Sequence, residues 1–164
     1  MPIGAQERDT IRVCTYNVLK YAETFPGGRA GSIRLVLREI WPDLLLVQDI
    51  SNSEGYDAFV STVLLIAELR RELQGSHFVD GPDTDNAIFY DSTKLEFISQ
   101  EGVVTAVRTI DHWMGRVKAT GDTLHVFVCH LKAGDTPADA AERAAQTAAL
   151  RQYMDGLPAS HPRI

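Results

Sequence analysis

Short apolar runs alternate with helical patterns along most of the chain. Runs rich in β-branched and aromatic residues predict strands at residues 11–16, 44–47, 87–90, 95–98, 103–107 and 124–129. The run at 44–47 is apolar at every position, which predicts a strand buried on both faces. Strands that alternate with helices and then follow one another in a series predict an α/β sandwich.

Two helices are predicted in the first half of the chain. Ser32 is expected to cap the first, because the apolar spacing of a helix begins at Ile33, and Pro42 is expected to end it. The second is predicted from the apolar spacing that begins at Tyr56, and it should end near residues 73–75.

A third helix is predicted after residue 136. Thr136 is the expected cap, Pro137 occupies the first helical position, and Asp139 stands where a capping box needs its acidic partner. A stripe of small apolar side chains is expected to face the core. It comprises Ala141, Ala144, Ala145 and Ala148.

Composition limits the classes of protein that fit. The 164 residues carry a net charge of −6, which disfavours binding to extended nucleic acid because that needs a basic face. No apolar run reaches the roughly 18 residues of a membrane span. Residues 1–10 are interpreted as a flexible tail without a signal-peptide pattern, so a cytoplasmic location is the default expectation. Cys14 and Cys129 are interpreted as free thiols.

Three predicted strands end in a polar residue. These residues are Asn17, Asp49 and His130. Ligand sites of α/β folds often lie beyond the carboxyl ends of sheet strands, so parallel neighbouring strands would bring the three side chains to one edge. Amide and carboxylate oxygens suit Mg²⁺ or Mn²⁺, and histidine can exchange a proton near neutral pH. Each residue alone also fits a turn, a cap or a structural histidine.

Several stretches together resemble the endonuclease/exonuclease/phosphatase superfamily of deoxyribonuclease-like phosphoesterases. Residues 11–19 resemble its opening strand, residues 42–49 its second motif, and residues 128–132 its His-Leu-Lys motif. Residues 85–90 resemble the intervening strand, and Arg143 lies where the following helix often carries an arginine. The order and approximate spacing agree across residues 11–164, the expected extent of the domain.

The resemblance implies a four-layer α/β/β/α sandwich that hydrolyses phosphate esters with a water activated by Mg²⁺ or Mn²⁺. It implies that Asn17 and Asp49 bind the metal, and that Asn17 and His130 contact the substrate phosphate. It also implies catalytic roles for His130 and Asp85. Taken alone, the acidic cluster of Asp80, Asp83 and Asp85 lacks the calcium-loop pattern and is interpreted as a solvated turn.

The sequence departs from the family pattern in two ways. Asp49 stands in place of the usual glutamate, and the later Gly-Asp-x-Asn and Asp-His motifs do not occur. The chain is therefore expected to form the N-terminal half of the sandwich, truncated on its C-terminal side. An uncovered apolar sheet face, with residues such as Val13 and Val126, could then drive self-association. The alternatives are a non-catalytic half-domain that serves as an interaction module and an unrelated α/β binding module.

Overall fold

The computed structural model describes residues 10–21, 28–64, 73–81 and 83–158. Within these residues the strands are β1 (Val13–Tyr21), β2 (Leu44–Ile50), β3 (Leu73–Gly75), β4 (Asp85–Asp91), β5 (Leu95–Val103), β6 (Ile110–Val117) and β7 (Thr123–Val128). The helices are α1 (Ala30–Ile40), α2 (Ser53–Phe59), which continues as a π-helical segment (Val60–Leu64), and α3 (Pro137–Asp155). The expected tail lies outside the described residues except for Thr10.

The strands form two separate sheets. Sheet A has the order β1-β2-β4-β3, in which β1 and β2 are parallel and β4 is antiparallel to β2 and β3. Sheet B is the antiparallel series β5-β6-β7. The predicted α/β class is confirmed, whereas the four-layer arrangement stays a prediction.

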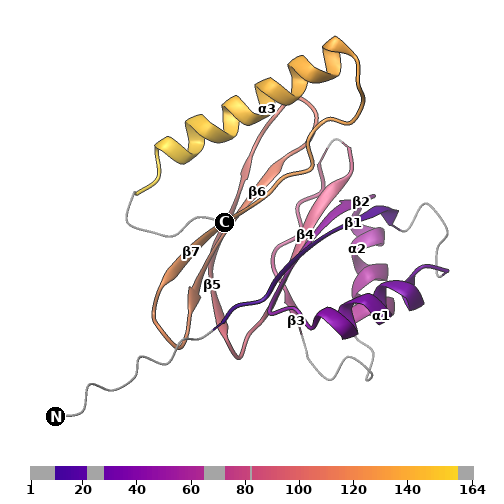
Figure 1. The fold of residues 1–164 in the computed structure, drawn as a ribbon, viewed down its shortest axis with the longest axis vertical. Helices are drawn as coiled ribbons and strands as arrows, with labels where there is room; N and C mark the ends of the chain where they lie inside the picture. Colours follow the sequence, from indigo (N-terminus) through magenta and orange to yellow (C-terminus); the bar gives the residue numbers. More distant parts are fainter. Residues whose placement is uncertain (1–9, 22–27, 65–72, 82, 159–164) are drawn as a thin grey trace.

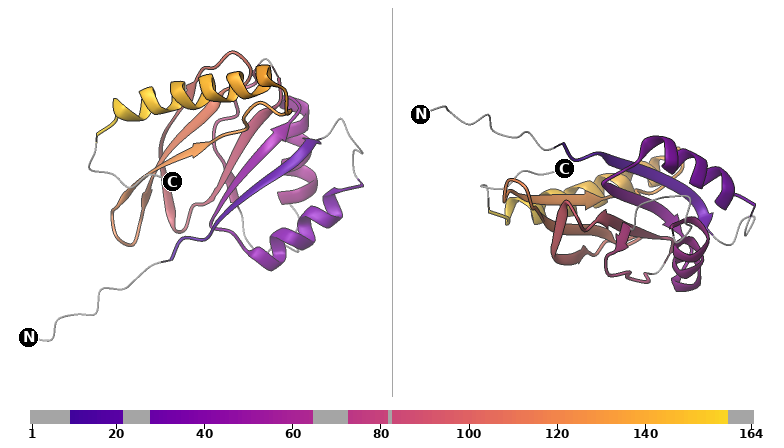
Figure 2. Two further views of the ribbon diagram at one scale, coloured as in Figure 1. Left: turned by 45° about the horizontal axis from the view of Figure 1, so that its top comes forward. Right: turned by 90° about the horizontal axis from the view of Figure 1, so that it is seen from below.

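The two faces of β2 explain how the layers are held together. Leu45 and Val47 point into a core with the helices α1 and α2, whereas Leu44 and Leu46 point into a second core with sheet B. This alternation follows from the two-residue period of a strand, and every residue of β2 is buried. Figure 1 shows α1 and α2 on one side of the two sheets and α3 beside sheet B, and the views in Figure 2 agree.

The apolar sheet face that was expected to be uncovered is for the most part buried. Val126 is fully buried and Val128 is 1% exposed, as part of the core between the sheets. Val13 is the exception, at 36% exposed. Sheet B covers the face of sheet A that the helices leave open, so self-association through such a face loses its basis.

The first two helices differ from the prediction at their ends. Helix α1 begins at Ala30, so Ser32 lies inside the helix and does not cap it, and the N-cap Arg29 makes no side-chain capping bond. Its end before Pro42 is confirmed, with Trp41 in the left-handed region at φ 55°. The second helix was expected to end near 73–75, and these residues pair with β4 as the edge strand β3, while residues 65–72 before them lie outside the described residues.

The predicted strand at 103–107 is also wrong. Strand β5 ends at Val103, and the strand that follows it, β6, begins at Ile110. The hydrophobic pattern does not predict β6, because this strand buries the polar side chains of Asp111 and His112.

Helix α3 begins as predicted but packs differently. Thr136 Oγ1 accepts a hydrogen bond from the Asp139 N–H, and the Asp139 carboxylate accepts one from the Thr136 N–H. The alanine stripe expected inside is exposed, and the buried residue of α3 is Gln146. In the described part of the chain, no helix is long and apolar enough to cross a membrane. Cys14 and Cys129 are free thiols.

Candidate functional site

The predicted site residues meet at one end of the two sheets. Asn17 lies beside Gln48 in the parallel pairing of β1 with β2, and Asp49 follows Gln48 directly. His130 comes from the loop after β7 in sheet B. The expectation that all three strand ends share one sheet is therefore wrong, yet the Asn17 and His130 side chains lie in contact. The helices that begin at Ala30 and Pro137 accordingly contact different sheets.

Two hydrogen bonds determine how the Asn17 and His130 side chains face each other. Asn17 Oδ1 accepts the Leu19 N–H at 2.9 Å, which turns Asn17 Nδ2 toward His130 Nε2 at 3.4 Å. Because an amide NH₂ group only donates, His130 Nε2 must accept and the ring proton must reside on Nδ1. His130 Nδ1 lies 3.5 Å from Thr84 Oγ1, which can accept that proton.

The surroundings of His130 favour its neutral form. Burial lowers the pKa of His130, and the positive charge of Arg108 lowers it further. The carboxylates of Asp49 and Asp83 oppose this by raising the pKa. A protonated Nε2 would also face the Asn17 amide donor, so the geometry and the electrostatics agree on a neutral ring without ligand.

Asp49 occupies an irregular position in β2. The pairing of β2 with β4 shifts between Gln48, which pairs with Asn86, and Ile50, which pairs with Asp85. Asp49 lies at this shift with φ at 72°, in the left-handed region that aspartate tolerates better than most residues. Such irregularities often re-aim a side chain next to a functional site. The Asp49 side chain is buried close enough to His130 to influence its charge.

Asp85 is buried, so its interpretation as part of a solvated turn is wrong. Its Oδ1 accepts the Gly81 N–H at 2.9 Å, whereas its buried Oδ2 has no hydrogen-bond partner. Burial is the main cause that raises the pKa of Asp85 to about 6, and the nearby carboxylates of Asp80, Asp111 and Asp83 raise it further. A carboxyl group of this kind exchanges its proton near neutral pH.

A buried polar network that sequence reasoning missed links the two sheets beneath this edge. Asn86 Nδ2 lies within hydrogen-bond distance of Asp111 Oδ2 at 3.0 Å, Thr109 O at 3.1 Å and Val128 O at 3.2 Å. Gln100 Nε2 donates to Asp111 Oδ1 at 3.2 Å. The available signal was a polar residue, Asn86, at the start of an apolar strand, and an aspartate next to the apolar Ile110.

The donor set fits a divalent cation only in part. Asn17 and Asp49 provide hard oxygen donors of the kind that Mg²⁺ binds, and Mg²⁺ usually keeps several waters. However, Asn17 Oδ1 already accepts the Leu19 N–H. Over residues 10–21, 28–64, 73–81 and 83–158, no three side chains of His, Cys, Asp or Glu gather where they could hold a metal ion.

Solved structures share the fold of this chain. No protein-family model and no curated protein sequence matches it. An endonuclease/exonuclease/phosphatase protein from Bacteroides vulgatus matches with a TM-score of 0.61 and 15% identity over 89% of this chain and 60% of that chain. The mannosyl-6-phosphatase of Bacteroides thetaiotaomicron matches with a TM-score of 0.61 and 16% identity over 94% and 63%.

The D. rerio protein TDP2, in complex with a single-strand DNA product, matches with a TM-score of 0.60 and 13% identity over 89% of this chain and 55% of that chain. The chain therefore spans somewhat more than half the length of these structures. The likenesses show that the chain shares its fold with these proteins, one of which is an endonuclease/exonuclease/phosphatase protein.

Proposed function

We propose that this chain supplies one part of a divalent-metal-dependent phosphoesterase site. The observation that carries the proposal is the contact between Asn17 of sheet A and His130, which lies in the loop after β7 of sheet B. The carboxylates of Asp49 and Asp83 lie close enough to His130 to raise its pKa. A fold shared with phosphate-ester-hydrolysing proteins supports it. In this proposal Asn17 and Asp49 hold Mg²⁺ or Mn²⁺, and Asp85 and His130 act as catalytic residues.

The side chains have complementary tasks toward a phosphate ester. Bound metal would neutralise charge in the transition state and activate a water molecule. Asn17 Nδ2 donates toward His130 in the structure and would donate to a phosphate oxygen when substrate enters. His130, neutral without ligand, would take up a proton as the phosphate approaches and would stabilise the oxygen that develops charge. Asp85, with its pKa raised to about 6, would exchange a proton with water or substrate.

We further propose that the site needs residues from outside the described part of the chain. Over the described residues, no three side chains of His, Cys, Asp or Glu gather where they could hold a metal ion. In this proposal the described residues support weak hydrolysis unless further ligands join them. The same observation favours the second candidate function, a non-catalytic half-domain that acts as an interaction module.

The proposed substrate is a phosphate ester without a long polyanionic chain. The net charge of −6 and the carboxylates of Asp49 and Asp83 near His130 would repel an extended nucleic acid. A small ester needs only one phosphate to enter the site, so metal can offset the local negative charge.

Hydrolysis assays distinguish the two candidate functions. Bis(p-nitrophenyl) phosphate and p-nitrophenyl phosphate are incubated with the protein in millimolar Mg²⁺ or Mn²⁺, and chelator is added to a parallel sample. The phosphoesterase proposal expects chelator-sensitive hydrolysis that falls by about 100-fold in His130→Gln. The exposed control Asp122→Asn should keep the activity of the unmodified chain. Hydrolysis that is absent, or equal in His130→Gln, would support the interaction module instead.

A further inference from the structure

We propose that Gln146 and Arg143 of α3 are positioning residues for His130, an inference that rests on the proposed function. They do not touch the site. They hold the backbone of the loop that follows His130, which is made of residues 131–134 and is called here the His130 loop.

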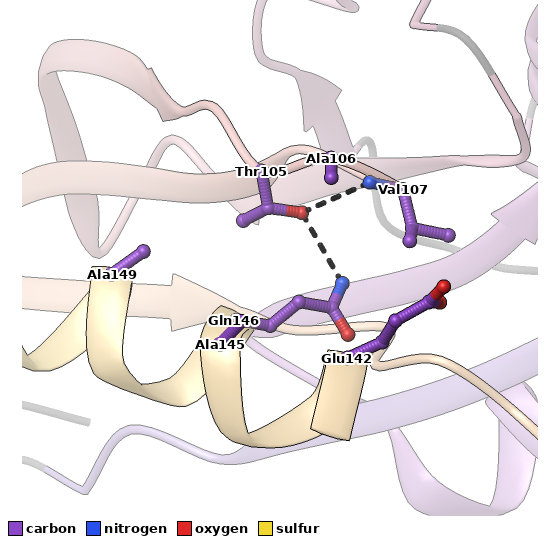
Figure 3. A pocket seen from close by; sticks show the side chains of 7 residues that line it. All are labelled: Thr105, Ala106, Val107, Glu142, Ala145, Gln146 and Ala149. Carbon is purple, nitrogen blue, oxygen red and sulfur yellow. Dashed lines mark hydrogen bonds between the residues drawn. The ribbon is translucent and has the colours of Figure 1, made fainter. Parts of the chain in front are cut away.

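Gln146 links the His130 loop to a second loop by both ends of its amide. Its Oε1 accepts the Lys132 N–H at 2.8 Å, and its Nε2 donates to Thr105 Oγ1 at 3.3 Å. Figure 3 shows the Gln146 side chain reaching from α3 toward Thr105, which also accepts the Val107 N–H. Gln146 is 2% exposed, so both ends of this amide are buried and bonded.

Arginine side chains hold three backbone carbonyl groups of the His130 loop. Arg143 donates to Lys132 O at 3.0 Å and to Gly134 O at 2.7 Å. Arg108, from the segment before β6, donates to Leu131 O at 3.1 Å. Lys132 is therefore held through its N–H by Gln146 and through its carbonyl by Arg143, two residues beyond His130.

Apolar packing does not explain the position of Gln146. A pocket of about 180 Å³ lies between α3 and residues 105–107, and its lining includes Ala145, Ala149 and Val107 (Figure 3). The pocket leaves open space beside the Gln146 side chain, so hydrogen bonds rather than close packing determine its direction. Directional bonds of this kind fix a loop more sharply than apolar contact, which tolerates sliding.

The consequence for His130 concerns its distance from Asn17. The 3.4 Å between His130 Nε2 and Asn17 Nδ2 joins two different sheets, so a shift of the His130 loop changes it directly. A displacement of about 1 Å in a catalytic group can reduce turnover by about 100-fold. In this inference, helix α3 affects turnover by holding the His130 loop, and it does not contact the substrate.

A matched pair of glutamine variants tests this inference. Gln146→Leu removes both bonds of the buried amide, and Gln152→Leu makes the same change at an exposed position of the same helix. Gln146→Glu keeps an acceptor for the Lys132 N–H and serves as the rescue. In Gln146→Leu, hydrogen exchange of the Lys132 amide should accelerate about 10-fold, as expected for the loss of one hydrogen bond. Gln152→Leu should leave it unchanged, and Gln146→Glu should restore it.

Kinetics provide the second readout. Where the unmodified protein hydrolyses the ester, Gln146→Leu should lower kcat by about 10-fold or more and leave KM within about twofold. The reason is that the variant changes the orientation of His130 and not the groups that bind substrate. Arg143→Leu, which removes the Nη1 group that donates to both carbonyls, should act in the same direction, whereas the exposed Arg151→Leu should not.

Two results would overturn the inference. The first is a Gln146→Leu variant that melts like the unmodified chain and shows neither faster hydrogen exchange of the Lys132 amide nor a shifted NMR resonance of the His130 ring. The second is equal loss of kcat in Gln146→Leu and Gln152→Leu. If the unmodified protein hydrolyses no phosphate ester, the proposed function fails, and the amide exchange and the His130 resonance still decide whether α3 positions the loop.

Discussion

The raised pKa of Asp85 predicts how acid affects the stability of the fold. In the unfolded chain this carboxyl group titrates near 3.8, and in the folded chain at about 6. Below pH 3.8 it is protonated in both states, so its burial costs little. Between pH 4 and pH 6 the unfolded state loses the proton first, and the stability that the neutral form provided is lost as the pH rises.

The size of the effect follows from the shift. A pKa that moves from 3.8 to about 6 on folding corresponds to about 3 kcal/mol of unfolding free energy. The physical source is a side chain that is 5% exposed, with one buried oxygen lacking a partner and three other carboxylates nearby. Asp85→Asn cannot titrate, so the difference between the unmodified chain and this variant isolates the contribution of Asp85.

Urea unfolding between pH 4 and pH 8 measures this difference. The unfolding free energy of the unmodified chain should fall by about 2 kcal/mol relative to Asp85→Asn as the pH rises through this range, because the rest of the change lies below pH 4. The exposed control Asp122→Asn should show a constant difference from the unmodified chain. Millimolar Mg²⁺ should reduce the loss, because a nearby cation favours the carboxylate. A difference that stays flat with pH would show that folding leaves the acidity of Asp85 unaltered, and the reasoning would be refuted.

Three further predictions concern single positions. Gly115→Ala should destabilise the fold by about 1–3 kcal/mol in urea unfolding, because an added Cβ would overlap the Trp113 ring. Thr136→Ala should cost about 1 kcal/mol in the same assay by removing the cap of α3, and an unchanged midpoint would contradict this. Asp49→Ala should abolish the Mg²⁺ or Mn²⁺ binding that is proposed for Asn17 and Asp49, measured by calorimetry, and unchanged binding would exclude Asp49 as a ligand.

Local sequence patterns predicted those elements whose cause is local. The strand β2 is apolar over its first four residues, and its burial on both faces follows from that run. The capping box of α3 needs only Thr136 and Asp139, which are three residues apart, so its prediction was also correct. The strand ends expected at Asn17 and Asp49 are wrong, because β1 continues to Tyr21 and β2 to Ile50, each past an irregular pairing.

The errors arise where distant partners satisfy buried polar groups. In β6, Asp111 is bonded by Asn86 and Gln100, and the His112 ring lies between His125 and Tyr153, so polar residues occur in a buried strand. A periodicity argument treats such residues as solvent-facing and therefore misses β6. Without β6 the position of β7 in a second sheet could not be derived, which is why one shared sheet was expected.

Because the site is divided between two sheets, its geometry depends on how sheet B is fixed above sheet A. The apolar core between them resists separation, but apolar contacts by themselves permit sliding. Asn86 restricts this sliding, because its amide on sheet A donates a directional hydrogen bond to Val128 O, two residues before His130. Gln146 holds Lys132, two residues after it. His130 is thus fixed on both sides by buried amides from different layers, which explains how a histidine on a loop can meet Asn17 in a defined orientation.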